Sequence, residues 1–166
     1  TNFISDTTTR PLDFPAWQSD GSHLYPAEDT ATKSLEEITR IGRNTGLGAM
    51  YVYLKDWETD DNAVKLLDYL LTDTEKHNVE VLLVQPPFQH ETYKILRENR
   101  EYKDIPNHYE AIVNSLLKLH KNTSYCNVIN PAIVACEPRE FMDSSHTLRS
   151  CAKKIIDYCL NKVPKR

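Results

Sequence analysis

From about residue 49 onward, the apolar residues follow two patterns that alternate along the chain. Short apolar runs, stopped by Pro or by turn residues, predict strands at 49–54, 79–85 and 125–129. Apolar residues three and four positions apart predict helices at 62–77, after Asp104-x-Pro106 and at 147–163, and a charged stretch at 91–101 is also expected to be helical. Because strands that alternate with helices form βαβ units, the pattern predicts an α/β fold with a mainly parallel sheet covered on both faces.

The N-terminal part of the chain has a less regular pattern. Prolines with aromatic residues between them predict an irregular arm over residues 1–28. A helix is expected from about Asp29, with Leu35 and Ile38 facing inward, and an end at Gly42 and the turn at 46–48. At 166 residues, the chain 1–166 fits a single domain.

The last predicted helix follows a loop of roughly fifteen residues, and loops of this length are usually functional. Its apolar stripe is expected to contain Leu148, Ala152, Ile155, Ile156, Cys159, Leu160 and Val163.

Composition excludes several classes of partner. The formal net charge is −4 and the basic residues are scattered, which argues against nucleic acid as a partner. Apolar runs stay well below the ~18 residues of a membrane span, so no membrane span is expected. The histidines fall on separate predicted elements and the few glycines form no phosphate-binding loop, so we expect no metal and no cofactor.

The four cysteines lack the spacing of metal ligands. Cys151 and Cys159 would lie about 12 Å apart along one helix, too far to bridge each other. We therefore expect buried free thiols.

Candidate chemistry lies where the predicted strands end, because ligands bind at the carboxyl edge of a parallel sheet. There, Asp143-x-x-His146 precedes the last helix. An aspartate at this spacing can orient an imidazole and leave its other nitrogen to accept a proton. The plainer interpretation is that Asp143 or Ser144 caps the helix and that His146 is a first-turn residue.

The order of elements adds to this motif. A strand ending in Pro86-Pro87 and followed by Tyr93, a short strand, a loop with Asp143-x-x-His146 and a closing helix resemble the SGNH (GDSL-like) hydrolase superfamily over residues 47–163. The likeness is greatest to its DltD and alginate-acetylation branches. It implies a three-layer sandwich with flavodoxin-like strand order. It also implies an esterase or O-acyltransferase, extracytoplasmic or secreted, that acts on an acylated carbohydrate or cell-envelope polymer.

By this resemblance His146 is the general base and Asp143 orients it, while a serine forms an acyl-enzyme. In the segment 3–10, Ser5 stands where the family has Gly and Thr7 where it has the nucleophilic Ser. This departure leaves three interpretations open. Either an upstream segment or partner chain supplies the nucleophile, or the site has decayed, or the segment is a flexible terminus.

Substrate-binding candidates come from the other predicted strand ends and from the arm. Lys55, Asp56 and Trp57 occupy the place of the family's Gly-x-Asn-Asp motif but lack its Asn, and Lys55 could act as a cation instead. His90 lies on the same predicted rim. A second Asp-x-x-His ends at His23, which could frame a sugar-binding groove with Trp17. Each candidate also has a plainer interpretation. Lys55 could be a solvated charge at a strand end, His90 a surface-loop residue, and the segment before His23 a turn.

Two non-enzymatic alternatives stay open. The first is a binding or assembly module that keeps the fold and has lost its nucleophile. The second is a flavodoxin-like regulatory or small-ligand domain without ester chemistry, which predicts that Asp143 and His146 face solvent without contacting each other.

Overall fold

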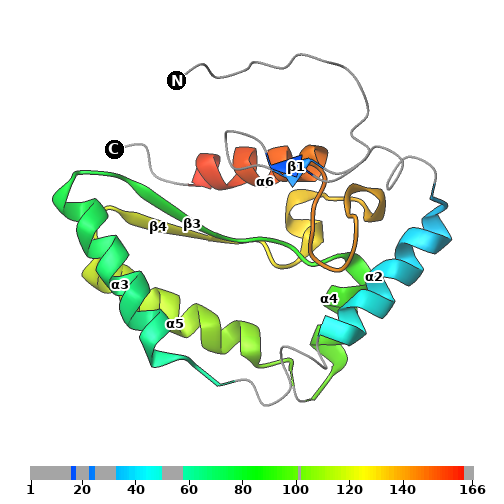
Figure 1. Cartoon of the computed structure of the whole chain (residues 1–166), viewed down its shortest axis with the longest axis horizontal. Helices are drawn as coiled ribbons and strands as arrows, with labels where there is room; N and C mark the ends of the chain where they lie inside the picture. The colour runs from blue at the N-terminus through cyan, green and yellow to red at the C-terminus, as the bar shows by residue number, and fades with distance from the viewer. Residues whose placement is uncertain (1–15, 18–22, 25–32, 50–57, 101, 163–166) are drawn as a thin grey trace. The chain divides into compact units, whose positions relative to one another are not determined.

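The structure is a computed structural model that describes residues 16–17, 23–24, 33–49, 58–100 and 102–162 (Figure 1). The chain divides into two compact units, Thr1–Ser34 and Leu35–Arg166. In the first unit, β1 (Ala16–Trp17) and β2 (His23–Leu24) form an antiparallel pair. The rest of the arm expected over residues 1–28 lies outside the described residues.

The second unit contains five described α-helices, two strands and two short 3₁₀ helices. They are α2 (Leu35–Ala49), α3 (Asp61–Lys76), β3 (Val81–Gln85), α4 (His90–Glu98), α5 (Ile105–Leu119), β4 (Thr123–Asn127), η2 (Pro131–Val134), η3 (Pro138–Glu140) and α6 (Arg149–Lys162). The helices predicted at 62–77, at 91–101 and after Asp104 are confirmed to within a few residues. The strand predicted at 49–54 lies outside the described residues, except that Ala49 ends α2.

Local capping explains why these helices begin where they do. The Asp60 carboxylate accepts a hydrogen bond from Asn62 N at 2.8 Å and starts α3. In the same way, the side-chain oxygen of Gln89 accepts from Glu91 N at 2.7 Å and starts α4. Pro106 stands in the first turn of α5, where its missing N–H costs nothing.

β3 and β4 pair in parallel, in register from Val81 opposite Thr123 to Gln85 opposite Asn127. The connection between them runs through α4 and α5. The described part of the chain is therefore a mixed helix–strand structure with a parallel strand pair, as the alternating pattern predicts.

Helices lie against both faces of β4. Successive strand residues point to opposite faces. Cys126 is bonded to Cys159 of α6, whereas its neighbour Asn127 donates from Nδ2 to Glu110 of α5 at 3.1 Å. The two helices accordingly lie on opposite sides of the strand pair (Figure 1).

All four cysteines form disulfides, so the prediction of free thiols is wrong. Cys126 bonds Cys159 and Cys136 bonds Cys151, with Cα–Cα distances of 5.6 and 5.3 Å. Cys151 and Cys159 cannot bridge each other along α6, but each reaches a cysteine on another element. Disulfides of this kind are typical of proteins that fold in an oxidising environment.

Among the described residues, many of the buried side chains gather in two hydrophobic clusters. The first joins the disulfides to the loop before α6 and consists of Cys126, Val128, Val134, Cys136, Phe141, Cys151, Ile155 and Cys159. The second is smaller and has Leu96, Tyr102 and Ile129 at its centre. The predicted stripe of α6 is too wide, because Ile156 and Leu160 are more than half exposed.

The helix α2 continues through Gly42 and Gly46, where the sequence predicted an end. Both glycines are contact points with α4. A Cβ at Gly42 would overlap the Gln89 side chain, and one at Gly46 would lie 2.7 Å from Thr92 Oγ1. Thr92 Oγ1 also donates to Gly42 O at 2.8 Å. The glycines therefore serve close helix packing.

No described helix has both the length and the apolar character needed to cross a membrane.

Candidate functional site

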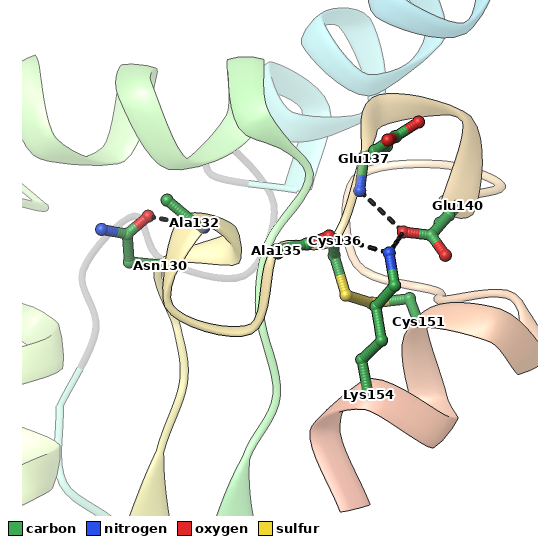
Figure 2. The surroundings of a disulfide bond; sticks show 8 residues. All are labelled: Asn130, Ala132, Ala135, Cys136, Glu137, Glu140, Cys151 and Lys154. Carbon is green, nitrogen blue, oxygen red and sulfur yellow. Dashed lines mark hydrogen bonds and ion pairs between the residues drawn. A yellow bond between two sulfur atoms is a disulfide. The ribbon is translucent and has the colours of Figure 1, made fainter. Parts of the chain in front are cut away.

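The loop that carries Asp143 and His146 is closed by the Cys136–Cys151 disulfide, which spans 15 positions of the sequence (Figure 2). Lys154 of α6 fixes the base of this loop. Its Nζ donates to Glu140 Oε2 at 2.7 Å and to Ala135 O at 2.8 Å. Glu140 Oε2 also accepts from Glu137 N at 2.7 Å, as Figure 2 shows. The disulfide and these contacts together tie the loop to α6.

Glu140 is ionised in this arrangement. Burial raises the pKa of its carboxyl, but hydrogen bonds from Lys154, from the Glu137 N–H and from Ser150 outweigh burial and hold the pKa below its ordinary value.

The other side of the loop docks on the start of α4. Gln89 N donates to Ser144 O at 2.9 Å, and Ser144 is buried. The ring of His90 meets the buried Phe141 ring edge-on, with a centroid distance of 6.1 Å. Since α4 follows β3, this contact places the loop beside the segment that leaves the carboxyl end of β3.

Within the loop, Asp143 and His146 form the hydrogen bond expected from their spacing. His146 Nδ1 lies 2.7 Å from Asp143 Oδ2. The other carboxylate oxygen, Oδ1, accepts from the backbone N–H groups of Ser145 and His146, both at 2.9 Å. This contact contradicts the expectation, made for the flavodoxin-like alternative, that the two side chains do not touch.

Asp143 is held in its charged form. Burial raises its pKa, but the two backbone hydrogen bonds and the His146 ring outweigh burial, and the pKa is lowered from its ordinary value. An ionised carboxylate at Nδ1 keeps the proton on that nitrogen and makes Nε2 the proton acceptor of the ring.

The helix-cap interpretation of the motif is wrong. α6 begins at Arg149, so neither Asp143 nor Ser144 is its cap and His146 lies outside its first turn. Asp143 instead caps the turn that it begins. An isolated β-bridge between Phe141 and Thr147 closes that turn.

His90 is the one predicted substrate-binding residue whose side chain the structure places near this loop. Burial lowers the pKa of its imidazole, and the neighbouring Glu91 only partly opposes the effect. His90 is consequently a neutral ring on the edge of the loop.

The remaining predicted site residues cannot be placed in the same way. Ser5, Thr7, Lys55, Asp56 and Trp57 lie outside the described residues. For Trp17 and His23 only the backbone is described, and the two are opposite each other in the β1–β2 pair.

Two features of the described residues had no signal in the sequence. His120 is buried at 4% exposure, with Nε2 at 2.8 Å from Asp68 Oδ1 and Nδ1 at 3.6 Å from Glu75 Oε2. Asp68 and His120 are 52 positions apart, so no local motif could reveal the pair. The second feature is an apolar pocket of 160 Å³ beyond the carboxyl ends of β3 and β4.

Within the described ranges, no three or more His, Cys, Asp and Glu side chains are arranged to hold a metal ion.

Comparison with protein-family models, curated proteins and solved structures finds no match for this chain. The likeness to SGNH hydrolases therefore remains a prediction from the sequence.

Proposed function

We propose that this protein carries out acyl-ester chemistry, as an SGNH-like esterase or O-acyltransferase, on an acylated carbohydrate or cell-envelope polymer. The observation that carries the proposal is the 2.7 Å hydrogen bond between His146 Nδ1 and Asp143 Oδ2 in a loop docked beside the carboxyl end of β3. Helices on both faces of β4 support the three-layer sandwich that this class requires.

The proposed roles follow from the charges. An ionised Asp143 stabilises the imidazolium that forms when His146 Nε2 takes a proton from an attacking hydroxyl. The disulfide and the Gln89–Ser144 hydrogen bond hold the loop in place before substrate binds, which lowers the cost of orienting the base. The candidate nucleophile is Thr7, Ser5 or a hydroxyl supplied by an upstream segment or a partner chain.

Two disulfides support the compartment that the substrate class requires. They favour an oxidising environment, so we place the protein outside the cytoplasm, either secreted or at the cell envelope.

The test is labelling of the intact, oxidised chain with a fluorophosphonate probe that reacts with activated hydroxyls. We expect labelling that falls at least 100-fold in His146→Ala, because loss of the base removes activation of the nucleophile. His77→Ala is the matched control. His77 is also exposed and its ring also hydrogen-bonds an aspartate residue, at the backbone oxygen of Asp73, but it lies far from the Asp143 loop in the sequence. Equal labelling of the two variants would contradict the proposed role.

The alternative is a non-catalytic binding or assembly module. One observation favours it: Asp143 Oδ1 already serves the turn by accepting two backbone hydrogen bonds. This alternative predicts a folded protein that the probe does not label, and an Asp143→Asn variant whose only defect is a less ordered loop.

A further inference from the structure

The apolar pocket lies where the strand ends, the α4 segment and the start of α5 meet. Gln85 ends β3 and Phe88 follows it, while Ile129 follows β4. The other lining residues are Leu96, Ile105, Pro106 and Tyr109. Leu96 and Ile129 are buried and form its base, whereas Tyr109 is 39% exposed and lies toward solvent. The pocket is a space next to the smaller hydrophobic cluster, whereas protein cores are normally packed without such spaces.

Its size limits what it can hold. A volume of 160 Å³ is close to the ~150 Å³ of an apolar cavity that accommodates one benzene molecule. An occupant therefore has an apolar body of about six carbon atoms.

One polar group in the lining has a fixed role. Tyr125 OH donates to Gln85 Oε1, so the oxygen of the Gln85 amide is already engaged. The Gln85 Nε2 group is then the part of this side chain that can donate to an occupant. An occupant with one hydrogen-bond acceptor fits this donor.

The charge around the pocket opposes an anion. Glu110 accepts from Asn127 close to the strand ends, and the pKa of Tyr125 is raised, first by burial and then by the charge of Glu110. No lysine or arginine is among the residues that line the pocket. A carboxylate placed here would lose its hydration without gaining a cation.

We propose that this pocket binds a small neutral molecule, or the neutral end of a larger one, that has an apolar body of about six carbons and one oxygen acceptor facing Gln85. The proposal is independent of the acyl-ester chemistry, since none of its lining residues belongs to the Asp143 loop.

The experiment is a titration of the ¹⁵N-labelled, oxidised chain with hexanamide and, separately, with hexanoate. The two probes have the same length and differ in charge. We expect hexanamide to shift the backbone amide signals of Phe88, Leu96 and Ile129 at millimolar concentration, and hexanoate to bind at least tenfold more weakly. Equal binding of both probes, or no shift with hexanamide, overturns the proposal.

Two variants locate the binding. Ile129→Phe fills the base of the pocket and should abolish the shifts, whereas Ile133→Phe, the same change at an exposed position, should leave them intact. Gln85→Glu keeps an acceptor for Tyr125 and removes the amide donor, so it should weaken hexanamide about tenfold. If Ile129→Phe does not fold, Gln85→Glu still tests whether hexanamide binds in this pocket. Hexanamide affinity that Gln85→Glu leaves unchanged overturns the proposed contact.

Discussion

The region from β4 to α6 and the helix α3 are held in the structure by different means. Two disulfides cross the first region and stand inside its hydrophobic cluster. α3 has one fully buried side chain, Leu71, and presents Leu66, Tyr69 and Leu70 largely to solvent. The first region is fixed by covalent bonds and burial. The helix α3 depends on its apolar anchor Leu71, on the partly buried Val64 and Leu67, and on polar contacts.

Two polar contacts join α3 to the residues that follow α5. The buried His120 ring hydrogen-bonds Asp68, and Lys121 N donates to Glu75 Oε1 at 3.1 Å. Each such contact contributes only about 1 kcal/mol net. We therefore expect α3 to open more readily than the disulfide-bonded region.

The difference shows where precision is needed. The Asp143–His146 pair lies inside the loop closed by Cys136–Cys151, so the candidate site is in the most constrained part of the described chain. Geometry held to a fraction of an ångström is what a proton-transfer site requires. No residue of the candidate site lies on α3, so the weaker attachment of this helix does not loosen the Asp143–His146 pair.

The largest effect is expected from removal of the disulfides, which tests whether they are what holds the region from β4 to α6. Cys136→Ala with Cys151→Ala opens a 15-residue loop and should lower the free energy of unfolding by about 3 kcal/mol, measured by urea denaturation. It should also free the Asp143 loop, seen as averaging of the His146 ring signals in NMR spectra.

The matched control is Cys126→Ala with Cys159→Ala, which opens a separation of 33 residues. It should cost about 4 kcal/mol and yet leave the His146 signals in place, because the loop keeps its own disulfide. If both pairs loosen the loop equally, the Cys136–Cys151 bond has no special role in ordering the site.

The next largest effect should come from the anchor of α3. Leu71 is 2% exposed, and Leu71→Ala should cost about 3 kcal/mol because it leaves a cavity. Leu70→Ala, one position away and about half exposed, should cost less than about 0.5 kcal/mol. Hydrogen exchange after Leu71→Ala should accelerate in α3 first; uniform acceleration across α3 and α6 would show that the two regions open together.

Local signals in the sequence were enough to predict much of the fold. α3, α4 and α5 appear within a few residues of their predicted bounds, because the spacing of apolar residues and the caps Asp60 and Gln89 act over one or two turns. The Asp143–His146 contact was predictable for the same reason, since its partners are three residues apart.

Features made by distant residues could not be predicted. The pairing of four cysteines depends on how β4 and the loop approach α6. Gly42 was expected to end a helix, and only the presence of Gln89 of α4 beside it reveals a packing role. The apolar pocket likewise combines side chains from α4, α5 and both strand ends.

The smallest expected effect concerns the charge of Asp143. It separates what this charge contributes to the order of the disulfide-bonded region from what the disulfides contribute. The pKa of Asp143 in the folded protein lies below its ordinary value of 3.8. A carboxyl with a lowered pKa adds stability above its unfolded pKa and loses it as the pH falls through the folded pKa. Asp143→Asn should therefore cost about 1 kcal/mol at neutral pH, because it removes charge-assisted hydrogen bonds.

The difference in unfolding free energy between the wild type and Asp143→Asn should shrink as the pH is lowered from about 5 toward about 2. Urea denaturation at each pH measures it, and the disulfides stay intact throughout. Asp157→Asn is the control, because Asp157 pairs with Lys153 on the exposed face of α6, where such pairs contribute little. A difference that stays constant down to the lowest pH would mean that the charge of Asp143 adds nothing to the order of the loop. The disulfide and the docking on α4 would then hold His146 by themselves.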